Sequence, residues 1–275
     1  MAITKASDKA ALPQLATELD ASQAASWRKD ATILAGRTAS SKQIDQLAAV
    51  LAESPHLNRL ASLFADDVPA LMAGKWEKVL KESKKEWQAA NQANPHDLQL
   101  MADIRKFRNR AHLAIALSEL LALMDVQQSW ALLTQIAEIA VQGVVSSLLK
   151  GQAVEECGWV IIGLGKLGAG ELNYSSDIDL IALYDPHADK TEDPSASEKR
   201  AKHFTKMTRR LSQLLSQQTK DGFGWRVDFR LRPDPAVTPL CLTTDAAVSY
   251  YESIARTWER AAFIRARPIA GNLEL

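Results

Sequence analysis

The stretch from Trp159 to Tyr184, WVIIGLGKLGAGELNYSSDIDLIALY, constrains the fold of this chain more than any other. It opens with an apolar run, Trp159 to Ile162, whose length suits a buried strand. The turn that follows contains four glycines, which adopt backbone conformations closed to other residues: Gly163, Gly165, Gly168 and Gly170. Ser175 to Ile181 then predicts a second strand, so the stretch indicates two strands joined through a tight turn.

Two carboxylates lie at the start of the second predicted strand. Because side chains alternate along a strand, Asp177 and Asp179 share one face while Ile178 and Leu180 share the other. Two like charges so close repel each other, and a shared cation relieves the repulsion. Asp228 is a third acid, from a later predicted strand, WRVDFRLRP. We predict that the three acids are catalytic and bind Mg²⁺ or Mn²⁺, which prefer oxygen ligands.

Donors for phosphate oxygens flank the predicted metal site. They come from the glycine turn, from the two serines before the acids, and from two arginines on the strand face of Asp228. The predicted substrate- and phosphate-binding residues are Gly165, Lys166, Ser175, Ser176, Arg230 and Arg232. For Lys166, as for Glu171 and Asn173, a hydrogen bond within the turn is an equal alternative. Together these groups fit nucleotidyl transfer, in which metal ions neutralise phosphate oxygens during in-line displacement.

Charge and cysteine content narrow the class of protein. Lys+Arg and Asp+Glu both total 33, so no overall basic field favours nonspecific nucleic-acid binding, although a local basic patch stays open. Cys157 and Cys241 lack the spacing of a zinc site or a disulfide framework. The N-terminal residues are not followed by an apolar signal core, and no long uninterrupted apolar run indicates a membrane span. We expect a cytoplasmic protein without a membrane partner.

Helical patterns dominate the first 150 residues. Boundaries are expected at Ser54-Pro55 and Asn94-Pro95, because a proline disfavours helix at the residue before it. Lys75 to Asn91 predicts a charged, mostly exposed helix, and the following helix has an apolar face formed by Leu100, Ile104, Phe107, Ala111 and Ile115. Its arginines, Arg105, Arg108 and Arg110, are expected on a solvated face. Another helix is expected from Trp130 to Lys150.

The second half alternates strands and helices. Pro186 to Lys199 predicts a surface loop, and Glu198 to Gln218 a helix with Phe204, Met207, Leu211, Leu214 and Leu215 on one face. Thr244-Asp245 is expected to cap a last helix, in which the aromatic residues around Trp258 pack internally. Helices first and mixed elements later indicate an α/β or α+β core behind a helical region.

Gly163 to Gly168 also matches the dinucleotide-binding pattern GxGxxG. We reject that interpretation because only Ala169 to Ser176 separate the third glycine from Asp177. That is room for about two helical turns, and a crossover between parallel strands usually needs more. A nucleoside-triphosphate phosphate loop is excluded as well, since no Gly-Lys-Ser/Thr ends the glycine run.

Several motifs together resemble one known family. GLGKLGAGELNYSSDIDLIALYD, RVDFRLRPDP, TWERAAFIRARPIAG and the helix IRKFRNRAHLAIALSEL are similar to the bifunctional glutamine synthetase adenylyltransferase/adenylyl-removing enzymes, over about Leu98 to Gly271. The resemblance implies an α+β, polymerase-β-like nucleotidyltransferase core, a small mixed sheet flanked by helices, at residues 151–275. A largely helical region, residues 1–150, precedes it. Family members continue well beyond this point, so the chain is expected to be a C-terminally truncated fragment.

The resemblance also implies an activity. The family carries two related nucleotidyltransferase domains, and GELNYSSDIDL is more similar to the N-terminal one, which removes AMP from a tyrosine of glutamine synthetase by phosphorolysis and releases ADP. Asp177, Asp179 and Asp228 then match the metal-binding acids, and Ser175 or Ser176 the serine beside them. The implied cofactor is Mg²⁺. The implied partners are glutamine synthetase, nucleotide, inorganic phosphate and a nitrogen-signalling regulatory protein.

Three other hypotheses stay open. One is attachment of AMP to glutamine synthetase from ATP on the same scaffold. Another is a non-catalytic regulatory or docking module with vestigial acids. The last is a nucleotidyltransferase with a small-molecule or nucleic-acid acceptor, because the metal motif does not specify the acceptor.

Overall fold

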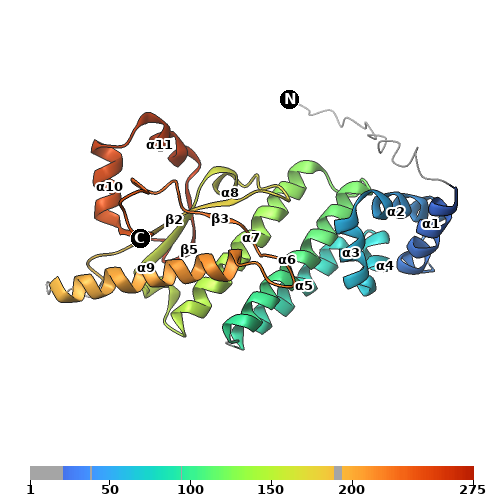
Figure 1. Ribbon diagram of the computed structural model, residues 1–275, viewed down its shortest axis with the longest axis horizontal. Helices are drawn as coiled ribbons and strands as arrows, with labels where there is room; N and C mark the ends of the chain where they lie inside the picture. Colours follow the sequence, from blue (N-terminus) through green and yellow to red (C-terminus); the bar gives the residue numbers. More distant parts are fainter. Residues whose placement is uncertain (1–20, 38, 94, 189–193) are drawn as a thin grey trace, which may run out of the picture. The chain divides into compact units, whose positions relative to one another are not determined.

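The computed structural model describes residues 21–37, 39–93, 95–188 and 194–275, which form two compact units (Figure 1). Unit 1 extends to Lys84 and includes Asn109–Ser129, and unit 2 consists of Lys85–Arg108 and Trp130–Leu275. The division differs from the boundary expected at residue 150, because three long helices each contribute residues to both units. They are α5 (Trp76–Gln92), α6 (Asp97–Leu120) and α7 (Val126–Leu149).

The other elements of unit 1 are short helices. They are α1 (Ala21–Ala35), α2 (Ser41–Glu53), α3 (Pro55–Leu63), η1 (Ala65–Asp67) and α4 (Val68–Met72). The predicted boundary at Ser54-Pro55 is confirmed: the Ser54 hydroxyl accepts a hydrogen bond from the amide of Leu57, and Pro55 occupies the first helical position. Proline suits that position because the amide it lacks would have had no partner inside the helix. At the second predicted boundary Asn94 lies outside the described residues, and α5 ends at Gln92.

The predicted apolar face of α6 is confirmed, since all five of its residues are buried: Leu100, Ile104, Phe107, Ala111 and Ile115. The prediction that α5 is mostly exposed is confirmed, and the helix is anchored by a few buried residues that include Val79 and Trp87. Trp87 stacks on Phe107 with 5.8 Å between ring centroids. It also contacts Gly143 of α7, where an added Cβ would lie 2.5 Å from the indole ring.

The prediction of a solvated arginine face on α6 is wrong, because none of its three members is exposed. Arg108 is half-buried, and its guanidinium lies 5.4 Å from the centre of the Phe223 ring. Arg105 is fully buried and donates to the carbonyl oxygens of four residues, Met101, Leu214, Gln217 and Gly222. Burial lowers the pKa of Arg105, an effect that Asp221 partly offsets. Arg110, in unit 1, forms a bidentate ion pair with Asp67, in which two guanidinium nitrogens lie 2.6 and 2.8 Å from the two carboxylate oxygens. Charge alone predicts exposure, but these guanidinium groups have enough partners to be buried.

Unit 2 contains a small mixed sheet, as the α+β prediction requires. Its strands are β1 (Trp159–Gly163), β2 (Ile178–Tyr184), β3 (Val227–Asp228), β4 (Cys241–Thr243) and β5 (Arg267–Gly271). Strand β1 lies antiparallel between β2 and β5. The other edge of β2 pairs in parallel with β3 near its start and with β4 near its end. Since β1 and β2 are antiparallel, they do not form the parallel unit that dinucleotide binding needs, which confirms the rejection of that interpretation.

Helix α9 (Pro194–Ser216) packs on the sheet through its predicted apolar face (Figure 1). Phe204 stacks on Tyr184 of β2 at 5.1 Å and on Trp159 of β1 at 6.3 Å. The helix begins earlier than predicted, at Pro194, so the loop expected through Lys199 is wrong for its last six residues. Proline is favoured in a first helical turn, a signal that competes with its use in loops. Residues 189–193 of that predicted loop lie outside the described residues.

The remaining elements of unit 2 are short: η2 (Val154–Glu156), α8 (Gly165–Ala169), α10 (Thr244–Ser253), α11 (Thr257–Ala262) and η3 (Phe263–Arg265). The predicted last helix is in fact two, α10 and α11. Its cap is Thr243 rather than Thr244, because the Thr243 hydroxyl accepts from the amide of Ala246. Tyr251 packs on Phe263 as expected, but Trp258 is 56% exposed, so its predicted packing is wrong.

Helix α7 is long and apolar enough to cross a membrane by length and composition, the one such helix among the described residues. Half of its most apolar window is buried within the protein, and Gln142 donates to the Ile269 carbonyl of β5. Core helices of proteins without a membrane span have the same length and composition.

Replacing Arg105 by methionine tests the buried guanidinium. The change removes the guanidinium donor from four carbonyl groups, of which that of Gly222 keeps the amide and hydroxyl of Thr219 as donors. We therefore expect the free energy of unfolding to fall by roughly 3 kcal/mol. Urea denaturation followed by circular dichroism measures it. Lys106→Met on the same helix is the control, because Lys106 is exposed and should change stability by about 0.5 kcal/mol or less. Equal losses in both variants would contradict the structural role of Arg105.

Candidate functional site

Strand β2 positions two of the three predicted acids. Ile178 and Leu180 are completely buried, which turns the alternate residues, Asp177 and Asp179, away from the core. Asp177 directly precedes the strand and is exposed, whereas Asp179 is half-buried. The predicted sharing of faces is therefore confirmed, although the strand begins at Ile178 instead of Ser175.

Strand β3 brings the third acid next to this pair. Ile178 is in register with Val227, and Asp179 with Asp228, in a parallel pairing supported by a 2.9 Å hydrogen bond from the Ile178 amide to the Arg226 carbonyl. Residues in register on neighbouring strands share a face, and the strands lie about 4.8 Å apart. Two acids separated by 49 positions in the sequence are thus side by side.

The surroundings of Asp179 disfavour its negatively charged form. Burial raises the pKa of Asp179, and the neighbouring carboxylates of Asp228 and Asp177 raise it further, while Arg230 acts in the opposite direction. Asp228 behaves differently, because hydrogen bonds from Arg230 lower its pKa despite partial burial. Asp179 is therefore the acid that a cation would stabilise most.

The absence of a side chain at Gly165 leaves space for the Asp179 carboxylate. The φ of Gly165, +54°, lies in the left-handed region, and a Cβ there would stand 2.6 Å from an oxygen of the Asp179 carboxylate. The Leu164 amide in turn donates to the main-chain carbonyl of Asp179 at 3.0 Å. The glycine turn thus lies directly against the acid. Lys166, the next residue, is exposed, and its carbonyl accepts the amides of Gly170 and Glu171 at the end of α8.

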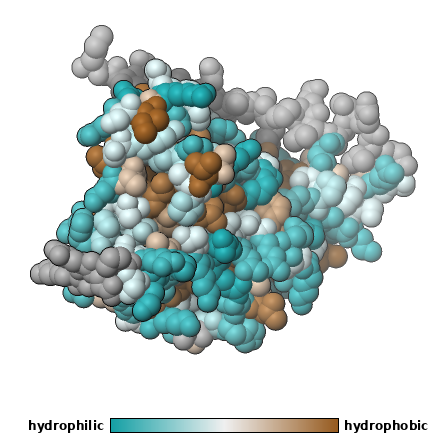
Figure 2. All heavy atoms as spheres, turned by 60° about the vertical axis from the view of Figure 1, so that its left-hand side comes forward, coloured by the Kyte–Doolittle hydropathy of each residue, from teal (hydrophilic) through white to brown (hydrophobic). Residues whose placement is uncertain are grey.

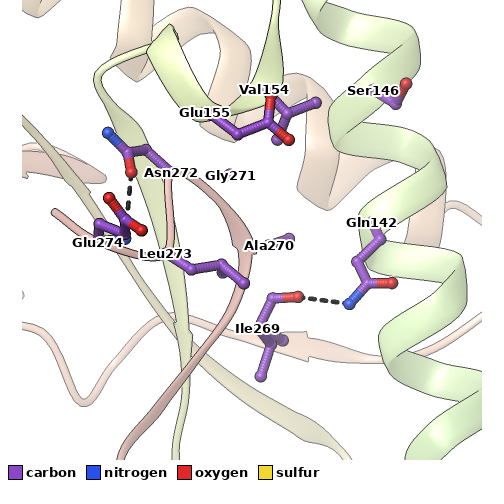
Figure 3. A pocket seen from close by; sticks show the side chains of 10 residues that line it. All are labelled: Gln142, Ser146, Val154, Glu155, Ile269, Ala270, Gly271, Asn272, Leu273 and Glu274. Carbon is purple, nitrogen blue, oxygen red and sulfur yellow. Dashed lines mark hydrogen bonds between the residues drawn. The ribbon is translucent and has the colours of Figure 1, made fainter.

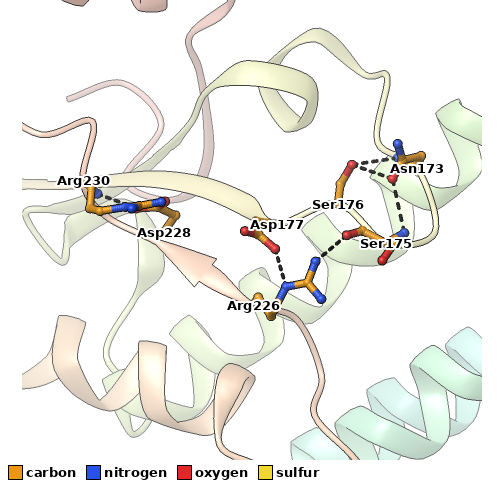
Figure 4. A network of polar contacts seen from close by, with 7 residues as sticks. All are labelled: Asn173, Ser175, Ser176, Asp177, Arg226, Asp228 and Arg230. Carbon is orange, nitrogen blue, oxygen red and sulfur yellow. Dashed lines mark hydrogen bonds and ion pairs between the residues drawn. The ribbon is translucent and has the colours of Figure 1, made fainter.

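Asn173, Ser175 and Ser176 form a hydrogen-bonded turn before the acids (Figure 4). The Asn173 side-chain oxygen accepts from the Ser176 hydroxyl at 2.7 Å and from the Ser175 amide at 3.2 Å. The alternative of a turn hydrogen bond is thus what the structure shows for Asn173. The second alternative residue, Glu171, forms an ion pair with Arg265 at 2.9 Å.

Arg226 is a site residue that sequence reasoning missed. Its guanidinium lies between the Asp177 carboxylate and the Ser175 carbonyl and donates to both (Figure 4). The available signal was alternation: Arg226, Asp228 and Arg230 occupy every second position, so a strand there would place all three on one face. The predicted phosphate-binding arginines are Arg230 and Arg232, which follow Asp228, and the set does not include the arginine before it.

The two predicted phosphate-binding arginines lie in different surroundings. Arg230 is 83% exposed and covers the Asp228 carboxylate with hydrogen bonds of 2.5 to 3.0 Å (Figure 4). Arg232 is turned into its own loop, where it donates to the carbonyl oxygens of Phe229, Pro235, Thr238 and Pro239. The structure therefore brings Arg230, but not Arg232, to the acids.

The strand predicted over WRVDFRLRP is wrong beyond Asp228. The Arg230 amide donates to the Asp228 carboxylate at 2.7 Å, and the Arg232 amide to the Phe229 carbonyl at 3.3 Å, so the chain turns after two strand residues. Pro233 and Pro235 follow and have no amide to continue a ladder. Local hydrogen bonding overrides the alternating pattern here.

The acids fit a divalent cation in chemistry and only in part in geometry. Carboxylate oxygens are the ligands that Mg²⁺ and Mn²⁺ prefer, and the mutual repulsion around Asp179 favours a cation. In the parts of the chain that the structure describes, however, no three acidic, histidine or cysteine side chains are grouped closely enough to hold a metal ion. Arginines neutralise two of the acids, since Arg226 pairs with Asp177 and Arg230 with Asp228.

A hollow of about 490 Å³ lies elsewhere in unit 2, beside β5 and α7 (Figure 3). Gln142 and Ser146 line it from α7, and Ile269 to Glu274 from β5 and the residues after it. Its lining includes none of the three acids, so it does not extend the candidate site.

Comparison with known proteins identifies the family. A family model described as glutamate-ammonia ligase adenylyltransferase matches residues 44–275, a span that contains every predicted site residue. This chain belongs to the glutamate-ammonia ligase adenylyltransferase family.

Related members of the family are longer. The bifunctional glutamine synthetase adenylyltransferase/adenylyl-removing enzyme of Rhizobium meliloti (strain 1021) is 38% identical over 94% of this chain and 28% of its own length. Its namesake from Brucella suis biovar 1 (strain 1330) is 36% identical over 84% of this chain and 25% of its own. The one from Rhodopseudomonas palustris (strain BisB5) is 43% identical over 67% and 20%. The chain spans about a quarter of the length of these relatives.

Replacing Asp179 by asparagine tests the electrostatic strain at the site of this family member. A carboxyl whose pKa is raised in the folded state loses stability as pH rises through the window between its ordinary pKa and the raised one. At neutral pH without metal, Asp179→Asn should therefore raise the melting temperature by a few degrees, and the gain should vanish at a pH below the ordinary pKa of aspartate. Differential scanning calorimetry measures it. Asp30→Asn, an exposed acid of α1, should show no gain.

Proposed function

We propose that this chain is a metal-dependent nucleotidyltransferase that removes AMP from an adenylylated tyrosine of glutamine synthetase by phosphorolysis, releasing ADP. Two findings support the proposal. The relatives are named for adenylyl transfer to and removal from glutamine synthetase. The observation that carries it is the register of Asp179 with Asp228, which pairs the two predicted acids on one face beside Asp177.

The proposed reaction exchanges one oxygen for another at phosphorus. An oxygen of inorganic phosphate attacks the phosphorus of the AMP–tyrosine bond, the bond to the tyrosine oxygen breaks, and the tyrosine leaves and gains a proton. The products are ADP and unmodified tyrosine. A divalent cation held by Asp177, Asp179 and Asp228 supplies positive charge to the phosphate oxygens when it is bound.

The described side chains provide further charge at the same place. Arg226 and Arg230 are largely exposed and already pair with carboxylate oxygens of the site. Phosphate oxygens are equally good partners for a guanidinium, so both arginines can transfer from the acids to substrate phosphates. Neutralisation of the acids by a cation would favour that exchange. Mg²⁺, with Mn²⁺ as a substitute, is the proposed cofactor.

Glutamine synthetase, nucleotide and inorganic phosphate are the proposed partners, and a nitrogen-signalling regulatory protein is a further one. The cytoplasm is the proposed location, as the sequence alone indicates. Arg232 stays among the predicted phosphate-binding residues, but its four carbonyl contacts favour a role in closing its loop.

An assay on the protein substrate tests the activity. The chain, incubated with adenylylated glutamine synthetase, Mg²⁺ and phosphate, should release ADP, measured by a coupled enzyme or by chromatography. Asp177→Asn with Asp179→Asn should lower the rate at least about 100-fold, because two charges that hold the cation are lost. Asp30→Asn should keep it. Absence of ADP from the folded wild-type chain would contradict the proposal, and consumption of ATP with release of pyrophosphate would assign the attachment reaction instead.

A second candidate is a docking module without catalysis. One observation favours it: two of the three acids form ion pairs with arginines, Asp177 with Arg226 and Asp228 with Arg230. A titration with Mn²⁺, followed by electron paramagnetic resonance, separates the two functions. If the site is catalytic, the wild-type chain binds Mn²⁺, and the variant Asp177→Asn with Asp179→Asn binds at least about tenfold more weakly. Equal, negligible binding by both proteins would favour the docking module.

A further inference from the structure

The middle of helix α9 carries positive charges only. Between Lys199 and Arg210 it contains six lysines and arginines and no acid, in a chain whose formal net charge is zero. The apolar stripe of the helix packs on the sheet, which leaves most of these cations on the opposite, outer face. Arg200 is the exception, because it is buried and donates to the Pro186 carbonyl. Figure 2 shows hydrophilic side chains along this part of the molecule.

A hollow of about 600 Å³ lies between α9, the end of α7 and the start of α6. We name it the α9 basic cleft and define it by its four lysine and arginine residues, Lys150, Lys206, Arg209 and Arg210. Leu148 and Met207 add apolar surface to its lining. Its volume is in the range typical of small-molecule sites, and its lining shares no residue with the acid site.

The cations of the cleft are only partly neutralised. Arg210 pairs with Asp97, the one acid in the lining, and also donates to the side chain of Gln213. Over the described ranges, Lys150, Lys206 and Arg209 have no ion-pair partner. With one cation balanced by Asp97, about three positive charges face one hollow.

The unpaired cations of the cleft come from two elements, helix α9 and the end of α7. Lys206 and Arg209 are neighbours on one face of α9, three residues apart. Lys150 reaches the cleft from the end of α7, where its φ of +50° and that of +90° at Gly151 end the helix in a tight turn. A non-glycine residue in the left-handed region carries backbone strain. Such a conformation persists only where the surrounding structure holds it, so the backbone of Lys150 is fixed in place.

We propose that the α9 basic cleft binds a small molecule that carries two or more phosphate groups. A concave surface with cations on two sides can surround such a ligand, and guanidinium and ammonium groups pair strongly with phosphate oxygens. About three unpaired positive charges match the charge of a short phosphate chain. Leu148 and Met207 offer an apolar surface for a base or another nonpolar group. The cleft is an additional site, independent of the proposed transfer reaction.

Isothermal titration with inorganic triphosphate tests the site. It is run in EDTA, to exclude metal-mediated binding, at about 0.15 M salt. We expect saturable binding by the wild-type chain, and binding at least tenfold weaker for Lys206→Gln with Arg209→Gln. Lys84→Gln with Lys85→Gln on α5 removes the same charge from another exposed helix face and should leave the affinity unchanged. A parallel titration with ATP shows whether a base adds affinity to the phosphate chain.

Melting curves establish that each variant is folded. A wild-type chain without saturable binding overturns the proposal, and so do equal losses in the two lysine- and arginine-to-glutamine variants. Asp177→Asn with Asp179→Asn should bind triphosphate like the wild type; loss of binding there would assign the ligand to the acid site instead. Binding of an acidic peptide through Lys206 and Arg209, without binding of triphosphate, would overturn the proposal in favour of a protein-docking surface.

Discussion

Two opposing effects determine the acidic site. Burial of the apolar side chains of β2 aligns the carboxylates on one face, and the carboxylates so aligned repel each other. Ile178 and Leu180 are fully buried, and their burial forces Asp179 onto the face where Asp228 also lies. The hydrophobic gain of two such side chains is about 4 kcal/mol, enough to hold two like charges at neighbouring positions. The raised pKa of Asp179 records the cost of that arrangement.

The sequence predicts the elements that depend on local periodicity. The strands β1 and β2, the glycine turn and the apolar faces of α6 and α9 all follow from spacing, because burial of a regular face repeats every two or 3.6 residues. The position of Asp228 beside Asp179 was also predicted, but on a strand that proved to be only two residues long. A short strand supplies the same register as a long one, which is why Asp179 and Asp228 are neighbours although the predicted strand was too long.

The failures have a common physical origin, since each depends on partners distant in the sequence or on competing local hydrogen bonds. Arg105 was expected in solvent, and only the folded chain brings the carbonyls of Leu214, Gln217 and Gly222 to it. Arg226 was overlooked because its partner, Asp177, lies 49 positions away. Arg232 alternates with Asp228 in sequence, yet the turn that follows β3 takes it into its own loop.

The edge of β2 that carries β3 has a further consequence. A third of the acidic site depends on a strand of two residues, joined to β2 near the point where the acids emerge and followed at once by a turn. So few main-chain hydrogen bonds open far more readily than the core of the sheet does. Fraying of this edge would separate Asp228 from Asp179 while β1, β2 and β5 stay paired. Such an opening would break the acidic site without unfolding the rest of the sheet.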